Sequence, residues 1–336
     1  MLSSENKVCV LTVTYGNRWH FLQQVLLLVT SQSQVAHIIV VDNASDYSVL
    51  IRVKELLNDR ITVITNTENK GSAGGYKMAM EYAMINTDAD LFWLLDDDNL
   101  PDTTAIPKLL TEWQNIDSAA DRKALFCLRE DRVQHIRIAK GESPYRYYLV
   151  PNNFMGFNIF RVIPNQIKKL TSRFDNNQPY KERVQMPYVP YGGLLLHRKM
   201  IELIGYPNED FFLYVDDSEY TYRITKNGGV IWLIPECKVV DIDKSQGIGY
   251  KPRLFHSHLL DQWSFHTYYH VRNRMYFYKD NFITNTLVFK INKTLYLSYL
   301  KIISLLSSKR LEYQKLSTAV NDGLNGKLGK APKDKF

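Results

Sequence analysis

The sequence predicts an α/β fold with a mostly parallel central sheet and helices on both of its faces. β-branched apolar runs alternate with helix-forming segments through the first hundred residues. Each apolar run stops at polar or glycine residues, which are typical of turns. The composition is that of a globular protein, with 45% hydrophobic and 23% charged residues. Together these observations favour repeated βαβ units.

The elements of the first half are expected to follow strictly in the order strand, helix, strand. Their predicted ranges are 9–15, 19–32, 37–45, 49–58, 61–67, 76–86 and 90–95. The glycine-rich segment 69–75 is expected to be a turn before the third helix. Because the carboxyl ends of parallel strands share one edge, the polar turns that follow these strands should converge there.

The second half of the chain has a weaker pattern. Between about 120 and 190, six prolines indicate irregular strands and loops. Regular structure is expected again later, with a strand and helix in 188–205, a helix in 216–227, a strand in 230–235 and helices in 263–282 and 287–306. The last sixteen residues are expected to be frayed.

The predicted domains are an α/β domain over 1–245, with halves at about 1–100 and 120–245, and a helical region over 246–336. Residues 281–336 contain ten Lys or Arg and three Asp or Glu, whereas the rest has 32 of each sign. This distribution does not indicate nucleic-acid binding, for which a basic stripe on the folded body is more typical. A basic tail suits an anionic membrane surface, or it simply aids solubility.

A basic amphipathic helix is predicted over about 285–310. Its apolar face comprises Val288, Ile291, Leu295, Tyr299, Ile302 and Leu306. This pattern is equally consistent with binding to a membrane surface and with packing on the rest of the protein or on a partner.

Several classes of protein are excluded by the sequence. The three cysteines are far apart and form no CxxC pair, which excludes a disulfide scaffold and indicates a reducing compartment. We find no pattern typical of a signal peptide and no uninterrupted run of 18 apolar residues. We therefore expect a cytoplasmic protein.

The strongest chemical signal is Asp96-Asp97-Asp98, which follows the apolar run LFWLL. Three adjacent carboxylates at a strand end repel one another, and Mg²⁺ or Mn²⁺ would compensate their charge. The alternative is a solvated acidic turn.

Two further segments are expected at the same edge of the sheet. The glycines of 69–75 would let the backbone approach a ligand, with a helix N-terminus behind them that favours anions. Asp42-Asn43 can hold a base or ribose hydroxyls. A tight turn and an Asx turn are the respective alternatives.

Asp216-Asp217-Ser218-Glu219 stands at a predicted helix N-terminus. Asp217 is a candidate general base for an acceptor hydroxyl. The alternative is N-capping, because Asp216 followed by Glu219 matches an acidic capping box.

Seven segments resemble the family-two glycosyltransferases, which are inverting enzymes of the GT-A fold. They are VTYGN (13–17), VVDNAS (40–45), NKGSAGG (69–75), LLDDD (94–98), YGGLLLHR (191–198), FFLYVDDSEYTYRI (211–224) and YYHVRNRMYFY (268–278). The resemblance covers most of 8–280 and is closest to the bacterial rhamnosyltransferase and galactofuranosyltransferase branch. It implies a Rossmann-like GT-A domain with a C-terminal helical extension.

The resemblance also implies roles for individual residues. Asp217, beside Asp216, matches the catalytic base. The implied donor-binding residues are Thr14, Tyr15, Asn17, Arg18, Asp42, Asn69, Gly71, Gly74, Gly75, Lys77, Asp96 and Asp97. The implied sugar and acceptor pocket comprises Trp93, Tyr191, Gly192, Gly193 and Glu219.

The acid run would be the family's DxD motif, with Asp98, and Asp96 beside it, binding Mn²⁺ or Mg²⁺. The galactofuranosyltransferases place a metal-ligating histidine near the positions of Asp241 and Asp243, but this chain has no histidine between 198 and 255. Three alternatives follow: an aspartate replaces it, His256 or His258 folds back, or the metal has fewer protein ligands.

By this resemblance, the protein would move galactofuranose or rhamnose from a UDP- or dTDP-linked donor to a bacterial surface glycan such as lipopolysaccharide or capsule. The acceptor would be carried on a lipid at the inner membrane face, where the protein would be peripheral. A homo-oligomer stays open. The alternatives are a sugar nucleotidyltransferase, for which only Arg18 is available near the N-terminus to bind a triphosphate, and an inactive nucleotide- or carbohydrate-binding subunit.

Overall fold

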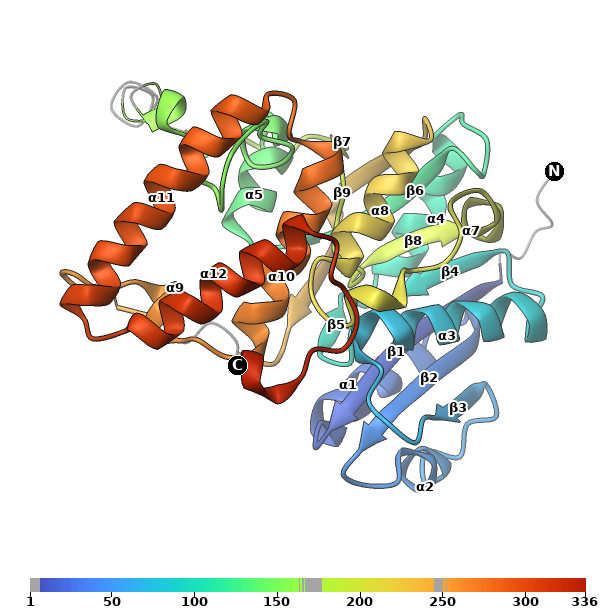
Figure 1. Cartoon of the computed structure of the whole chain (residues 1–336). Coiled ribbons are helices and arrows are strands. Elements are labelled where there is room, and N and C mark those ends of the chain that lie inside the picture. Colours follow the sequence, from blue (N-terminus) through green and yellow to red (C-terminus); the bar gives the residue numbers. More distant parts are fainter. Residues whose placement is uncertain (1–6, 163, 165, 167–176, 245–249, 252) are drawn as a thin grey trace. The chain divides into compact units, whose positions relative to one another are not determined.

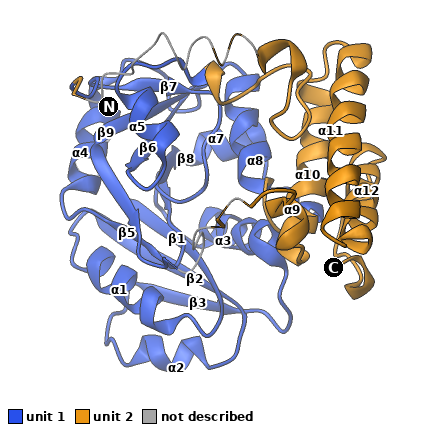
Figure 2. Ribbon diagram, turned by 90° about the vertical axis from the view of Figure 1, so that its left-hand side faces the viewer, with its two compact units in different colours: residues 1–144, 179–212, 216–246 blue, residues 145–178, 213–215, 247–336 orange. Residues whose placement is uncertain are grey.

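The computed structural model describes residues 7–162, 164, 166, 177–244, 250–251 and 253–336 (Figure 1). The chain divides into two compact units (Figure 2). The first contains 1–144, 179–212 and 216–246, and the second contains 145–178, 213–215 and 247–336. The segment 145–178 thus groups with the C-terminal helices.

The first unit is built on one sheet, in which the described residues form nine strands. Its first half has the order β3-β2-β1-β4, and every neighbouring pair is parallel. These strands are β1 (Val8–Gly16), β2 (Val35–Ser45), β3 (Ile61–Thr65) and β4 (Leu91–Leu94). The predicted α/β fold, with parallel strands from the first hundred residues, is confirmed.

The second half of the sheet is mixed. β8 (Leu194–His197) runs antiparallel to both β4 and β6 (Lys123–Arg129). β6 then pairs in parallel with β9 (Val230–Asp241). The short strands β5 (Asn99–Pro101) and β7 (Val184–Met186) both pair antiparallel with β9. The sheet thus brings residues near 18, 98, 129 and 241 to one region.

Helices cover both faces of this sheet (Figure 1). On one face, α1 (Trp19–Thr30), α2 (Val49–Lys54) and α4 (Ala105–Asn115) bury apolar residues against alternate positions of β1, β2 and β4. α3 (Gly71–Asn86) packs on the opposite face, where Gly75 lies directly against Val13. The two-residue repeat of the strands therefore gives each face its own core.

The structure differs from expectation in the middle of the chain. The region expected to be irregular contains β6, which is buried at all seven positions, and α5 (Val133–Ala139). α4 was not predicted, and α2 ends four residues earlier than expected. α7 (Arg198–Ile204) and α8 (Asp216–Lys226) agree with the predicted helices. Local pattern did not find β6 because its two flanking partners are supplied by distant parts of the chain.

The glycine-rich segment is the first turn of α3 and not a turn before it. Gly71 adopts a positive φ of 72°, and a Cβ there would stand 1.8 Å from the backbone oxygen of Phe212. A Cβ on Gly75 would stand 2.6 Å from Val13. Glycine is therefore required for helix α3 to begin this close to the backbone of Phe212 and the side chain of Val13.

The second unit contains α9 (His258–Asp261), α10 (Phe265–Asn281), α11 (Thr286–Leu306) and α12 (Arg310–Leu324). α12 packs on α10 so closely that a Cβ on Gly323 would come within 2.1 Å of the Arg272 backbone oxygen. The C-terminal residue Phe336 contacts the rings of Tyr268 and Tyr269. The expectation of a frayed end is wrong, because these contacts hold the end of the chain on the helices.

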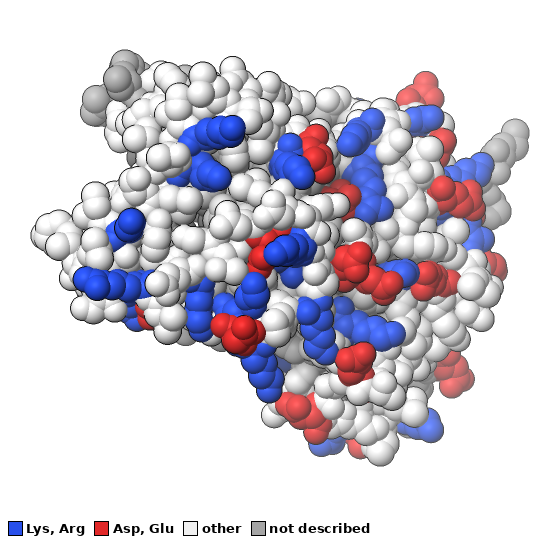
Figure 3. Space-filling model, viewed as in Figure 1, with Lys and Arg blue, Asp and Glu red and all other residues white. Residues whose placement is uncertain are grey.

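No helix among the described residues has the length and apolar character needed to cross a membrane. On the face drawn in Figure 3, lysine and arginine side chains are interspersed with acidic ones.

Candidate functional site

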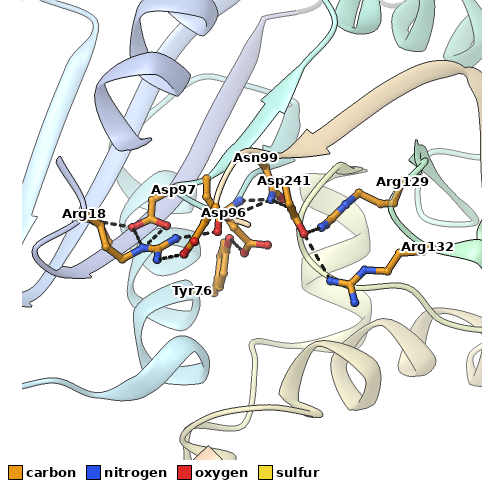
Figure 4. A network of polar contacts seen from close by, with 11 residues as sticks. Arg18, Tyr76, Asp96, Asp97, Asn99, Arg129, Arg132 and Asp241 are labelled. Carbon is orange, nitrogen blue, oxygen red and sulfur yellow. Dashed lines mark hydrogen bonds and ion pairs between the residues drawn. The ribbon is translucent and has the colours of Figure 1, made fainter. Parts of the chain in front are cut away.

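The carboxylates that follow β4 are held by Arg18, the residue that precedes α1 (Figure 4). Arg18 Nε donates to Asp97 at 2.9 Å, and its two terminal nitrogens donate to Asp98 and Asp243, each at 2.7 Å. Thr14 Oγ1 also donates to Asp97 at 2.7 Å. Asp97 is only 3% exposed, so the interpretation as a solvated acidic turn is wrong.

A second arginine serves the other side of the same cluster. Arg129, at the end of β6, pairs with Asp241, and Arg132 lies 3.5 Å from the same carboxylate. Asn99 Nδ2 donates to Asp98 at 3.1 Å and to Asp241 at 2.6 Å, which joins the two halves of the network (Figure 4). Asp241 and Asp243 are therefore brought to the acid run.

Burial governs the protonation of these carboxyl groups. It raises the pKa of Asp97 to about 7, although Arg18 and Thr14 oppose this shift. Burial also raises the pKa of Asp98, to which neighbouring Asp96 contributes. An additional positive charge at this edge of the sheet would therefore be stabilised strongly.

The first two turns of α3 connect the acid run with the candidate catalytic base. Tyr76 donates its hydroxyl proton to Asp96 at 2.8 Å, and Ser72 donates to Asp216 at 2.8 Å. On the other side, Asn43 Nδ2 donates to the backbone oxygen of Gly71 at 2.9 Å. α3 thus fixes three separately predicted motifs relative to one another.

Asp217 combines a raised pKa with partial exposure, whereas Asp216 is buried. Burial raises the pKa of Asp217 to about 6, and the backbone N–H and hydroxyl of Ser218 oppose this shift. The pKa of Asp216 is raised further, first by burial and then by the charge of Asp217. A carboxylate with a pKa near neutrality that a substrate can reach is suited to general-base work.

The capping-box interpretation of this motif finds no support in Glu219. Its carboxylate pairs with Arg223 one turn further along α8, at 2.8 and 2.5 Å. The backbone just before α8 is unusual, since Phe212, Tyr214 and Val215 all adopt positive φ near 64°. Such strain is concentrated at sites where geometry matters for function.

Tyr191 lies beside these acidic groups. Its ring packs against the Tyr76 ring at a tilt of 40°, with centroids 4.2 Å apart, and its buried hydroxyl has no hydrogen-bond partner among the described residues. Burial, and next the charges of Asp216 and Asp217, keep the pKa of Tyr191 well above its usual value, so it stays a donor. Gly192 lies so close to the acid run that a Cβ would stand 2.7 Å from Asp96 Oδ2 and 1.7 Å from Asn99 Oδ1.

Several other predicted donor residues lie at the same edge. Asp42 lies three residues before the end of β2 and accepts the backbone N–H of Ser45 at 2.9 Å. Asn69 accepts the N–H of Gly71 at 2.7 Å. Tyr15, near the end of β1, and Asn17, just after it, are exposed, and the Arg18 guanidinium lies 5.5 Å from the Tyr15 ring.

Four other predicted residues make contacts that explain them by structure alone. Trp93 is 1% exposed and packs in the core that α1 and α4 cover, so the structure does not bring it to the sheet edge. Lys77 pairs with Glu209 at 2.7 Å. Gly74 packs against the side chain of Lys70, and Gly193 has a φ of 101° where β8 begins. Sequence reasoning placed Trp93 wrongly because strand alternation alone does not say which face carries a ligand.

The carboxylate and amide oxygens at this edge are the kind of ligands that Mg²⁺ and Mn²⁺ prefer. Within the described part of the chain, however, no three His, Cys, Asp or Glu side chains form a group that could hold a metal ion. Both oxygens of Asp98 are used, by Arg18 and by Asn99. A metal with one or two carboxylate ligands and substrate phosphates remains chemically suitable.

The two candidate histidines belong to the second unit. His256 contacts Asp261 at 3.0 Å, and the ring of His258 stands edge-on to Tyr250. Their described contacts therefore include none with the acid run.

Four site residues were missed by the sequence analysis: Ser72, Tyr76, Asn99 and Arg129. Asn99 directly follows the acid run, which was an available signal. Arg129 stands at the end of an apolar run, and a buried charge there needs a partner.

Comparison with known proteins identifies the fold and the family. The family model described as "Glycosyl transferase family 2" matches residues 9–177. Galactofuranosyltransferase GlfT1 of Mycolicibacterium smegmatis is 25% identical over 66% of this chain and 66% of its own length. The dTDP-rhamnosyl transferase RfbF of Shigella flexneri is 21% identical over 96% of this chain and 97% of its own. The chain thus spans just under two thirds of the first of these relatives.

A solved structure has the same fold. It is the mannosyltransferase PcManGT of Pyrobaculum calidifontis in complex with GDP-Man and Mn²⁺, with a TM-score of 0.52 and 15% identity. The match covers 97% of this chain and 89% of the other. The expected GT-A fold is confirmed.

Replacing Arg18 with glutamine should lower the free energy of unfolding by about 3 kcal/mol, because buried carboxylates lose their shared cation. The affected side chains are at most 14% exposed. Arg52→Gln is the matched control, since that side chain is 52% exposed and its loss should cost less than about 1 kcal/mol. Urea unfolding of both variants measures the difference. Equal losses would contradict the assigned role of Arg18.

Proposed function

Because this chain belongs to glycosyl transferase family 2, we propose that it transfers a sugar from a nucleotide-sugar donor to a hydroxyl group of a glycan, inverting the anomeric carbon. The observation that carries this proposal is that α3 is hydrogen-bonded to both acidic motifs. Through Tyr76 and Ser72, one helix connects the acid run at Asp96 with the aspartate pair at Asp216. The proposed donor site and the proposed base therefore belong to one site, in which a donor and an acceptor can bind together.

In this proposal, the donor nucleotide lies along the edge formed by β1, β2 and β4. Asp42 and Asn43 near the end of β2 are suited to ribose and base, because hydrogen bonds to Ser45 and to Gly71 hold these polar side chains in place. The start of α3 directs backbone N–H groups toward the edge, which favours a diphosphate. The other donor-binding residues that the resemblance implies are proposed in the same role.

Asp217 is the proposed general base. It takes the proton of the acceptor hydroxyl, whose oxygen attacks the anomeric carbon from the face opposite the leaving diphosphate. A single displacement inverts configuration and forms no covalent enzyme intermediate. The Tyr191 hydroxyl, buried beside Asp216 and Asp217, is suited to donate a hydrogen bond to the bound sugar.

Mn²⁺ or Mg²⁺ is the proposed cofactor, with Asp98 and Asp96 as the protein groups that would hold it. When bound, such an ion neutralises the negative charge of the leaving diphosphate. The protein would supply these carboxylates, and Asp98 would exchange its ion pair with Arg18 for the metal ion. Without the ion, Arg18 balances the charge of Asp98.

The proposed donors are UDP-galactofuranose and dTDP-rhamnose, and the proposed acceptor is a growing bacterial surface glycan. The names of the two curated relatives support these sugars. UDP-hexopyranoses are the remaining candidates.

We also propose that the protein is cytoplasmic and binds peripherally to an anionic membrane through α11. The face of α11 that packs on the protein contains Phe289, Asn292, Leu300 and Ile303. The apolar face predicted from the sequence is instead exposed: Ile291, Leu295, Tyr299, Ile302 and Leu306 are 37 to 59% exposed. Lys290, Lys293 and Lys301 on the same helix would attract anionic lipid headgroups.

Asp217→Asn should reduce kcat about a thousandfold while leaving nucleotide-sugar binding unchanged, because only proton transfer is lost. In the unchanged enzyme, kcat should fall about tenfold per pH unit below about 6, as Asp217 becomes protonated. Asp121→Asn, in which a partly exposed carboxylate near Arg122 is altered, is the control. Full activity of Asp217→Asn would exclude Asp217 as the base. If the unchanged protein binds the nucleotide sugar but transfers no sugar, a binding subunit is favoured.

Thermal unfolding with Mn²⁺ and either UDP or dTDP should reveal the donor base. A ligand at a hundredfold excess over its dissociation constant should stabilise the protein by about 2.7 kcal/mol. Asp98→Asn should remove the metal-dependent part of the shift, and Asp59→Asn, at an exposed position, should not. A shift that needs no metal, or that survives in Asp98→Asn, would refute the cofactor assignment.

Membrane binding can be measured by flotation with vesicles that contain phosphatidylglycerol or only phosphatidylcholine. The protein should float with the anionic vesicles, and Leu295→Gln combined with Ile302→Gln should abolish this. Ile85→Gln, at an 81% exposed apolar position in the first unit, should have no effect. Equal flotation of both variants would show that α11 is not the membrane-binding element.

A further inference from the structure

The second unit contains a pocket of about 280 Å³ that the proposed donor and base site does not use. Its wall includes three arginines, Arg146, Arg161 and Arg274, together with Tyr147, Phe157 and Tyr278. No aspartate or glutamate occurs among the described residues that line it. The volume is close to the lower end of the range for small-ligand sites.

The loop that forms one wall of the pocket is fixed by buried asparagines. Asn292 is fully buried in α11, where it accepts the N–H of Ile159 and donates to the Asn152 carbonyl, each at 2.9 Å. Asn153 is 2% exposed and bonds both Val150 and Gly156. These hydrogen bonds therefore hold the wall of the pocket in place without the help of a ligand.

The opposite wall comes from α10. The Arg274 guanidinium lies 5.1 Å from the Tyr278 ring and donates to the Tyr278 hydroxyl at 3.1 Å. Tyr278 itself is 5% exposed and belongs to the core of the unit. The position of this arginine is thus set by a rigid helix and a buried ring.

This arrangement has a clear chemical preference. Three arginine side chains line one small cavity, and an anion that enters the cavity is attracted by their positive charges. Guanidinium groups bind phosphate oxygens in pairs of hydrogen bonds, which favours phosphate over a less highly charged anion. The rings of Tyr147 and Phe157 add apolar surface for whatever is attached to the anion.

We propose that this arginine pocket binds a phosphate or diphosphate group of the acceptor. The inference rests on the proposed glycosyltransferase function, because it names the chemistry of the second substrate. Within the second unit, the pocket would hold the charged end of the acceptor whose hydroxyl group receives the sugar.

The test measures binding of inorganic pyrophosphate and of farnesyl diphosphate by calorimetry, with EDTA present so that no metal-bound diphosphate forms at the acid run. Both should bind the full-length protein, and Arg161→Gln and Arg274→Gln should each weaken both at least tenfold. Arg310→Gln, in which an exposed arginine at the start of α12 is changed, is the matched control and should bind as before. Tighter binding of farnesyl diphosphate than of pyrophosphate would identify a lipid-linked group, and equal binding a free one.

Failure of this proposal can be separated from failure of the proposed function. The same variants are tested for stabilisation by UDP with Mn²⁺, which uses the first unit and should be unchanged. The pocket proposal is overturned if neither diphosphate binds the unchanged protein, or if both arginine variants bind as the control does. Circular dichroism checks that Arg161→Gln and Arg274→Gln are folded. Because Arg161 lies outside α10, its variant keeps the test decisive even if Arg274→Gln disturbs that helix.

Discussion

The crowding of carboxylates at one edge of the sheet is the constraint on which the rest of this structure depends. Asp97, Asp98 and Asp243 converge on a single guanidinium, and Asp241 on another. Without these cations, several buried charges would repel one another in a medium of low dielectric. Because carboxylates outnumber the arginines at this edge, a ligand that binds together with a cation would be favoured there.

The helix α3 converts this charge cluster into a site. Its first turn needs glycine because it starts against the backbone of Phe212, and its second turn needs it because it lies against Val13. The close approach lets Ser72 and Tyr76 reach carboxylates from two distant segments. Close backbone packing, rather than flexibility, is thus the reason for the glycine-rich sequence.

Burial raises the pKa of both aspartates at the start of α8, but it acts more strongly on Asp216 than on Asp217. Asp216 is enclosed and bonded to Ser72, so it serves the structure of the site. Asp217 stays partly exposed, and burial raises its pKa only to about 6. It therefore remains ionised at neutral pH while being more basic than a free carboxylate, which a general base requires.

The sequence by itself determined the alternation of strands and helices in the first hundred residues, the position of the acid run at a strand end and the basic amphipathic character of residues 286–306. These features are local, since each depends on residue periodicity or on a single turn. Tertiary structure alone decided that Arg18 meets Asp243, 225 residues away, and that β6 brings Arg129 to Asp241. It also decided that Trp93 is buried in the core and that the apolar face of α11 is exposed. The physical reason is that the order of strands in a sheet, and the choice of which face is covered, depend on contacts between distant segments that no local pattern encodes.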